Sequence, residues 1–131
     1  MRSADPVEPV HVPRGRDGVI VLRMPAEVDL VSAGDLRDDM LSSLNREGAH
    51  LVMDALDVIF MDSSGVSALV RARQRADQLE GTLHVVTTAP AVVRVLQLTQ
   101  LDRYVGLVAT LDDAFACLGT GVSQHTCQPG F

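Results

Sequence analysis

The segment VIFMDSSGV, residues 58–66, decides the fold of this chain, because an apolar run changes there into a helical pattern. The run Val58–Met61 is apolar throughout, which is typical of a strand covered on both faces. Beyond Gly65, apolar residues recur at the spacing of one buried helix face: Val66, Leu69, Ala72, Ala76 and Leu79. The segment therefore predicts a buried strand that leads directly into a helix, and Gly81 is expected to end that helix.

Upstream of this segment, the sequence predicts a strand, a helix and a second strand. Val19–Met24 is almost continuously apolar, and a proline follows it. From Ser32 the period becomes helical, with one apolar face made of Ala33, Leu36, Met40, Leu41 and Leu44. Ser32 and Asp35 have the spacing of a capping box, and Gly48 fits the end of the helix. His50–Asp54 is then a short buried strand.

Downstream of the segment, strands and helices continue to alternate. Leu83–Thr87 is an apolar strand, and Pro90 stands where proline is favoured, in the first turn of a helix. The apolar side of that helix is predicted to be Val92, Val93, Leu96 and Leu98. Tyr104–Leu107 is predicted as a last short strand. Thr110 with Asp113 caps a final helix whose inner residues are Leu111, Ala114, Phe115 and Leu118.

This order of elements predicts an α/β fold. We expect a single domain over residues 7–119, with a mixed central β-sheet of about four or five strands and about four α-helices. The sheet is expected to be mixed because Val7–Val12, before a turn, would add an antiparallel edge strand. Residues 1–6 and 120–131 are polar and contain proline or glycine, so they are predicted to be flexible ends.

The composition excludes several classes of function. The 131 residues carry 17 acidic and 11 basic side chains, a net charge of −6, so a nucleic-acid partner is not expected. No apolar run approaches the roughly 18–20 residues of a membrane span, and the N-terminus lacks the apolar core of a signal peptide. A cytoplasmic protein without a membrane association is therefore expected.

The junction between the predicted strand and helix holds the candidate functional residue, Ser63. A helix start exposes backbone N–H groups and the positive end of the helix dipole. One interpretation is structural: Ser63 caps the helix, a role worth about 1 kcal/mol. The other is functional: a helix start accommodates a phosphate, and a phosphoserine beside Asp62 would concentrate negative charge and repel a partner fitted to the neutral hydroxyl.

The sequence resembles the STAS family of anti-sigma factor antagonists. The resemblance rests on Asp62–Gly65 after an apolar strand and on Glu27–Asp29 after an earlier one. It extends through residues 89–96 and 98–101, and it covers about residues 8 to 118 in matching order. The fold it implies is a single STAS-like α/β domain.

The resemblance also implies a mechanism. In this family the serine that follows the Asp, here Ser63, is phosphorylated by a partner that is both an anti-sigma factor and a serine kinase. The unphosphorylated antagonist binds this kinase and frees the sigma factor, phosphorylation ends the binding, and a serine phosphatase restores it. ATP and metal belong to the kinase, so the chain itself is expected to be no enzyme, to hold no cofactor and to bind no metal. The sequence indicates no oligomeric state.

Further residues are assigned to docking or to support of the phosphosite. Asp62, Ser64 and Gly65 adjoin Ser63, and Ser64 is a candidate for a supporting role or a minor second site. Ser67 lies near the expected docking face, at a position where the family often has Gly, as it does at Ala26 and Glu80. Glu27 and Asp29 either shape the docking surface or are ordinary solvated loop acids.

Weaker signals leave other interpretations open. A constitutive interaction module, in a signalling or transporter assembly and with its serines used only as caps, is the main alternative. An esterase motif is incomplete at residues 65–69, and the histidines show no pairing pattern. Cys117 and Cys127 are interpreted as one packed and one incidental cysteine, or as a pair that oxidation joins. Three further residues, Arg71, Arg73 and Arg75, are too close together to share one helix face, so they are interpreted as a solvated side of the helix and not as a phosphate clamp.

Overall fold

The computed structural model describes residues 19–47 and 50–120. Four strands, β1 (Val19–Arg23), β3 (His50–Asp54), β5 (Thr82–Val86) and β6 (Gly106–Val108), form one sheet in that order. A second, two-stranded sheet consists of β2 (Glu27–Val28) and β4 (Phe60–Met61). The helices are α1 (Leu30–Glu47), α2 (Ser63–Gln78), α3 (Pro90–Leu98) and α4 (Leu111–Thr120), with a 3-10 turn, η1, at Leu101–Arg103. The predicted α/β class is confirmed, and the four strands of the main sheet and the four α-helices agree with the expected about four or five strands and about four helices.

Every strand pair among the described residues is parallel, in the register Val19↔His50, His50↔Thr82 and His84↔Gly106. Each connection between neighbouring strands of the main sheet contains a helix, as a parallel pair requires. The antiparallel edge strand predicted at Val7–Val12 lies outside the described residues, as do the predicted flexible end 1–6 and the predicted helix end at Gly48. The flexible end predicted at 120–131 begins one residue too early, because α4 includes Thr120, and the rest of it lies outside the described residues.

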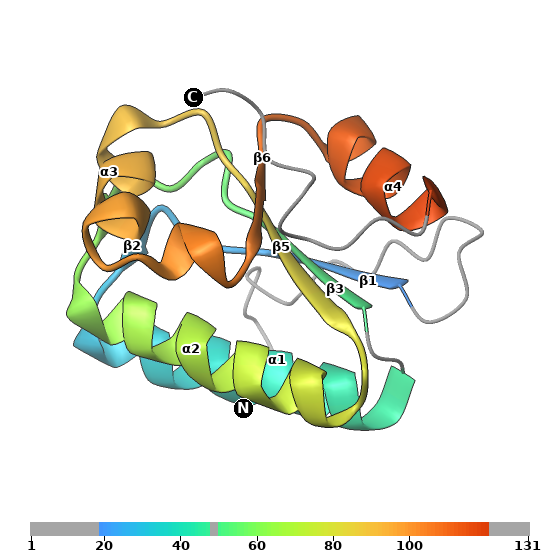
Figure 1. Cartoon of the computed structure of the whole chain (residues 1–131). Helices are drawn as coiled ribbons and strands as arrows, with labels where there is room; N and C mark the ends of the chain where they lie inside the picture. The colour runs from blue at the N-terminus through green and yellow to red at the C-terminus, as the bar shows by residue number, and fades with distance from the viewer. Residues whose placement is uncertain (1–18, 48–49, 121–131) are drawn as a thin grey trace.

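The main sheet is covered on both faces (Figure 1), where α1 and α2 lie on one face and α4 on the other. Alternate strand residues point to opposite faces, as the period of two dictates. Ile20 and Leu22 therefore join the larger core beneath α1, α2 and α3, whereas Val19 and Val21 join a smaller cluster with Ala114 of α4. Near-continuous apolar strands are thus explained by burial on both sides.

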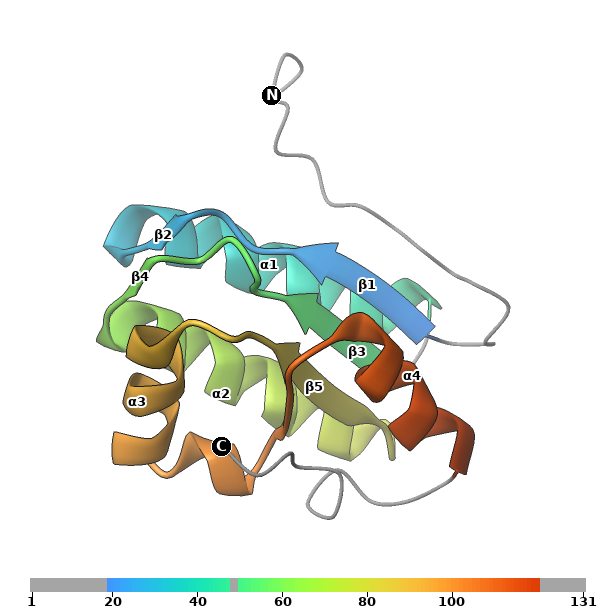
Figure 2. The same ribbon diagram turned by 90° about the horizontal axis from the view of Figure 1, so that it is seen from above.

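The small sheet lies at one end of the molecule, where β2 and β4 run side by side (Figure 2). Its register pairs Glu27 with Phe60 and Val28 with Met61. Only the last two residues of the run predicted as a buried strand form β4, and Ile59 and Phe60 are exposed. The prediction of a buried strand over Val58–Met61 was wrong in extent, because only one face of the two-residue strand β4 is covered.

Helix α1 begins one turn earlier than predicted. Asp29 caps it: its carboxylate accepts hydrogen bonds from the amides of Val31 (3.1 Å) and Ser32 (3.0 Å). Ser32 completes a capping box, since its Oγ accepts from the Asp29 amide at 3.0 Å. The pair Ser32 and Asp35 was the wrong choice, because the apolar residues of the first turn face solvent and so gave no periodic signal.

Smaller differences concern three predicted elements. The last strand is β6, shifted past Tyr104, which belongs instead to the turn after η1. Leu98 was wrongly placed on the inner side of α3, because its side chain is 74% exposed. The cap of α4 is confirmed, with the Asp113 amide donating to Thr110 Oγ1 at 3.0 Å.

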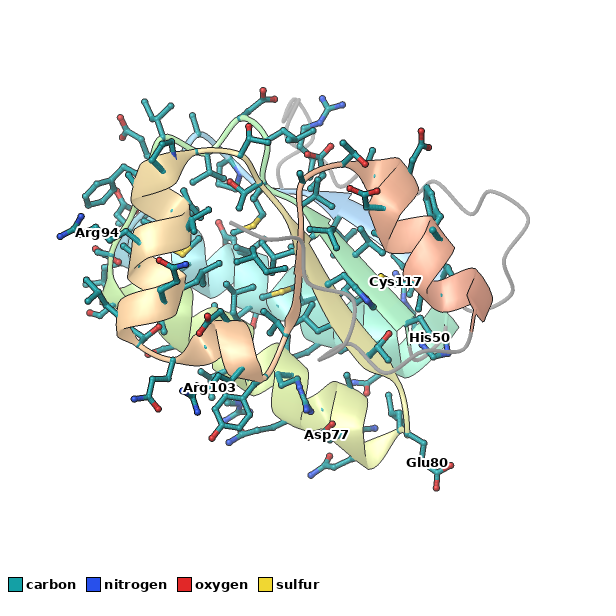
Figure 3. The ribbon with its side chains drawn as sticks, turned by 45° about the horizontal axis from the view of Figure 1, so that its top comes forward. His50, Asp77, Glu80, Arg94, Arg103 and Cys117 are labelled. Atoms are coloured by element: carbon teal, nitrogen blue, oxygen red, sulfur yellow. The ribbon has the colours of Figure 1, made fainter. Side chains whose placement is uncertain are left out.

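Helix α2 ends in a left-handed residue that is not glycine. Glu80 has φ 59°, and it follows the C-cap residue Leu79. The Gly81 amide donates to Ala76 O (2.7 Å) and the Glu80 amide to Asp77 O (3.0 Å), the two bonds of a Schellman motif. Glu80 projects into solvent there (Figure 3), so its side chain offers no packing that offsets the backbone strain.

We expect Glu80→Gly to raise the free energy of unfolding by about 1 kcal/mol, because glycine adopts this backbone conformation without a steric cost. Urea unfolding followed by circular dichroism measures the change. The matched control is Glu80→Ala, which removes the same charge but keeps a Cβ. An equal gain in both variants would contradict the backbone explanation.

His84 is a buried imidazole in the centre of β5, 1% exposed, with no hydrogen-bond partner for either ring nitrogen among the described residues. It lies against Gly106 of β6, where a Cβ would overlap the ring. Burial, and next the charge of His50, lowers the pKa of His84 to about 4 from 6.5.

The unfolded chain therefore binds a proton at His84 below pH 6.5, whereas the folded chain does so only near pH 4. We expect the free energy of unfolding to fall by about 2 kcal/mol between pH 7 and pH 5 through this residue. Urea midpoints across that range measure the slope, and His84→Leu should remove most of it. An unchanged slope in the variant would assign the pH dependence to other groups.

Candidate functional site

The candidate site is the junction of β4 and α2. Asp62 is the N-cap of α2, with extended backbone angles (φ −105°, ψ −169°). Its Oδ1 accepts from the Ser64 amide at 2.8 Å, and its carbonyl accepts from the Gly65 amide at 3.0 Å. Asp62 thus performs the capping role that the structural interpretation gave to Ser63.

Ser63 occupies the first residue of α2, and it is exposed. Its hydroxyl makes no hydrogen bond with any residue of the described ranges. The interpretation of Ser63 as a cap is therefore wrong, since the Asp62 carboxylate satisfies the amide that such a cap would bind. The structure thus leaves the Ser63 hydroxyl exposed at the start of α2.

Gly65 sets how closely the start of α2 approaches the small sheet. A Cβ on this buried glycine would lie 2.6 Å from Met61 Cγ and 2.7 Å from Val28 Cγ1, both closer than van der Waals contact. The Asp62 amide also donates to Val28 O at 3.2 Å. The turn that carries Ser63 is therefore attached to the small sheet on both sides, by the backbone hydrogen bond of Asp62 and by the close packing of Gly65 against the side chains of Val28 and Met61.

The start of α1 lies beside the start of α2, because β2 leads into one and β4 into the other. Asp29, which was predicted as a loop residue, is the cap of α1. Hydrogen bonds from the Ser32 amide and from the Val31 amide lower the pKa of its carboxyl group, although partial desolvation opposes the shift. Glu27 is exposed on β2 opposite Phe60. Glu27, Asp29 and Asp62 thus gather three carboxylates at the two helix starts.

Large apolar side chains are exposed around this junction. Leu30 (78% exposed) and Val31 (81%) lie in the first turn of α1. Ile59 (68%) directly precedes β4, and Phe60 (48%) is the first residue of β4. We call these four residues the apolar rim. Exposed apolar clusters with polar surroundings mark protein interaction sites. The apolar rim was not predicted, because Ile59 and Phe60 were assigned to a buried strand and Leu30 and Val31 to no element.

Ser64 and Ser67 face a different direction from Ser63. Both line a hollow of about 270 Å³ between α1 and α2, whereas Ser63 does not. The amide of Ser64 is bound by Asp62, so Ser64 supports the helix start through its backbone. Among the predicted site residues, the structure brings Asp62, Ser64 and Gly65 into one turn around Ser63, with Ser67 one turn further on.

The prediction that the three arginines of α2 form a solvated side of the helix was wrong for two of them. Arg73 is half-buried, donates to the Tyr104 carbonyl and pairs with Asp77, which projects from α2 (Figure 3). Arg75 donates to Asn45 Oδ1 (2.8 Å) and to Gln78 Oε1 (2.9 Å). Of the three, only Arg71 is exposed.

Other predicted features can be compared with the described ranges only. Residues 19–47 and 50–120 contain no cluster of three or more His, Cys, Asp or Glu side chains suited to a metal ion. None of the helices described there is long and apolar enough to span a membrane. Cys117 lies buried against the sheet and is disulfide-bonded, and Cys127 lies outside the described residues.

The fold and the helix junction define a STAS domain. The family model described as the STAS domain matches residues 12–114, most of the chain. The chain therefore belongs to the STAS-domain family.

Its similar proteins include anti-sigma factor antagonists. The anti-sigma F factor antagonist of Paenibacillus polymyxa is 28% identical over 87 residues, which are 66% of this chain and 74% of that relative. The crystal structure of an anti-sigma factor antagonist from Mycobacterium paratuberculosis is 30% identical, covers 87% of this chain and 97% of its own, and has a TM-score of 0.73.

The same fold also occurs inside a much larger protein. The murine anion transporter Slc26a9 matches 87% of this chain with a TM-score of 0.66 and 14% identity, and the match covers 21% of the transporter chain. This likeness concerns the fold alone.

The close approach at Gly65 leads to a testable pair of substitutions. We expect Gly65→Ala to lower the free energy of unfolding by about 1–3 kcal/mol, because Val28 and Met61 must move away from the new methyl group. Gly34→Ala in α1 is the control, since a Cβ there meets nothing within 4 Å. Alanine is the better helix former by about 1 kcal/mol, so the control variant should be more stable than the wild type.

Chemical unfolding in urea measures both variants. Opposite signs at the two glycines are the expected result. A stabilising Gly65→Ala would mean that the start of α2 is free to move away from the small sheet, and the fixed position of Ser63 would then be wrong.

Proposed function

We propose that this domain is an anti-sigma factor antagonist that binds a serine-kinase anti-sigma factor when Ser63 is unphosphorylated and so releases the sigma factor. Phosphorylation of Ser63 by that kinase ends the binding, and a serine phosphatase restores it. The observation that carries the proposal is the free, exposed hydroxyl of Ser63 beside the apolar rim. The named function of the relatives supports it.

The local charges explain how a phosphate would act. A phosphoserine carries about −1.5 to −2 charges at neutral pH. At the first residue of α2, the backbone amides and helix dipole accommodate that charge, so the domain itself stays folded. Glu27, Asp29 and Asp62 already make the surface around Ser63 acidic, and the added charge therefore changes the docking surface most strongly there.

The apolar rim supplies the second part of the binding site. Leu30, Val31, Ile59 and Phe60 offer apolar area that a partner would cover, while Ser63 lies close enough to be covered with them. A doubly charged group inside such an interface loses its hydration without a matching cation. The switch thus works by making burial of this surface costly.

The chain's own part in the phosphorylation is that of a substrate. The kinase partner supplies ATP and its metal ion, and the Ser63 oxygen attacks the γ-phosphorus, giving ADP and losing the hydroxyl proton. Asp62 and Gly65 act as positioning residues, because they hold the first turn of α2 in place. The remaining predicted site residues, Glu27, Asp29, Ser64 and Ser67, are proposed to shape the docking surface.

A constitutive interaction module is the second candidate, since the same fold forms part of a transporter chain. Such a module would bind its partner without any modification of Ser63. Phosphate incorporation separates the two candidates.

We expect one added phosphoryl group when the protein is incubated with ATP and its cognate serine-kinase anti-sigma factor from the same genome. Intact mass with site mapping should show that Ser63→Ala abolishes the addition and Ser64→Ala does not, because Ser63 is exposed whereas Ser64 is half-buried and lines the hollow between α1 and α2. The phosphorylated form should bind the kinase at least about tenfold more weakly.

Two results would overturn the proposal in different ways. Tight binding to a kinase without phosphate incorporation would identify a constitutive module. Absence of binding to every serine-kinase anti-sigma factor of the genome would remove the antagonist function and leave the fold unaffected.

A further inference from the structure

A cationic groove lies between the first halves of α1 and α2. It has a volume of about 270 Å³, and α1 contributes Leu30, Ala33, Gly34 and Arg37 to its lining. The lining from α2 consists of Ser64, Ser67, Ala68 and Arg71. Because Leu30 also belongs to the apolar rim and Ser64 adjoins Ser63, the groove continues the surface around the phosphosite.

Two guanidinium groups give this groove a charge opposite to that of the whole chain, whose net charge is −6. Arg37 is 47% exposed, and its one ion pair in the described residues is with its neighbour Asp38, at 3.5 Å. An exposed pair of this kind contributes little, because water and salt screen it. Arg71 is exposed and makes no hydrogen bond or ion pair with any described residue.

Arg37 of α1 and Arg71 of α2 differ in their contacts from the two remaining arginines of α2. Arg73 and Arg75 are engaged by Tyr104, Asp77, Asn45 and Gln78, so they stabilise the fold. The two groove arginines have donors to spare, and they come from two helices that lie side by side in both views (Figures 1 and 2). Arginine presents its donors in a planar fork that matches a carboxylate.

We propose that the cationic groove receives an acidic side chain of the partner protein, with Arg37 and Arg71 binding its carboxylate. The hydroxyls of Ser64 and Ser67 are further donors at the groove wall, and Leu30, Ala33 and Ala68 contact the apolar part of the side chain. This inference rests on the proposed function, and it adds the chemistry of the residue that the partner must supply.

The position of the groove links it to the switch. Ser64 and Arg71 are seven residues apart on one helix, which is about 10 Å along its axis. A phosphoryl group on Ser63 therefore adjoins one end of the groove and lies about one Debye length from Arg71 at the other end, close enough to repel an approaching carboxylate. Phosphorylation would oppose the partner at the apolar rim and at the cationic groove together.

Charge reversal tests this proposal on the full chain and its cognate kinase. Arg37→Glu and Arg71→Glu should each weaken binding about tenfold, and the double variant about a hundredfold, mainly through a slower association. The matched control is Arg103→Glu, an exposed arginine on η1 (Figure 3) that does not line the groove. Surface plasmon resonance at low and high salt measures the rates, and thermal unfolding confirms that each variant is folded.

A rescue experiment identifies the occupant. Acidic surface residues of the kinase are changed one at a time to Arg, and one exchange should restore binding of the double variant. Restoration by none, or binding of the double variant within twofold of the wild type, would overturn the acidic occupant. Since wild-type binding is measured in the same series, failure of the groove is distinguished from failure of the proposed function, in which the wild type itself does not bind.

Discussion

The parallel pairing of β2 with β4 is the constraint on which the rest of the site depends. Two residues of each strand suffice, because the Asp62 amide donates to Val28 O and Gly65 lets α2 approach Val28 and Met61 without a side chain between them. The pair brings the starts of α1 and α2 to one end of the molecule. Each start is capped by the carboxylate of an aspartate, Asp29 or Asp62. The result is two helix N-termini side by side, each with amides bonded to its capping aspartate, and with Ser63 left exposed.

This arrangement separates support from recognition. The residues that fix the geometry are buried or bonded: Asp29, Ser32, Asp62 and Gly65. The residues proposed to meet a partner, among them Ser63, the apolar rim and the two groove arginines, make few or no contacts within the described chain. Their side chains are therefore free to change with the partner, while the backbone beneath them stays the same.

Most of the fold could be predicted from the sequence, because β1, β3 and β5 and the helices each show a strong period or an uninterrupted apolar run. The errors have a common physical cause, which is that an apolar letter does not report burial. Leu30 and Val31 are exposed and added nothing to the helical period, so the start of α1 was predicted too late. Ile59 and Phe60 were assigned to a buried strand although they are exposed. The junction at Asp62–Gly65 was recognised because its residues adjoin in the chain. The cap was assigned to the wrong residue of that junction, and the cationic groove was missed, because Arg37 and Arg71 meet only once two helices are packed together.

The sheet also divides the molecule into two unequal sides. Its small cluster with α4 is separate from the core that supports α1 and α2, and the strands stand between them. Such a partition leaves the α4 side of the domain away from the surface that is proposed to dock. A tether, a fluorophore or a fused protein attached to the outer face of α4 would therefore leave that surface uncovered. The same geometry would allow this fold to form one part of a longer chain, attached on the α4 side while the face of α1 and α2 stays accessible.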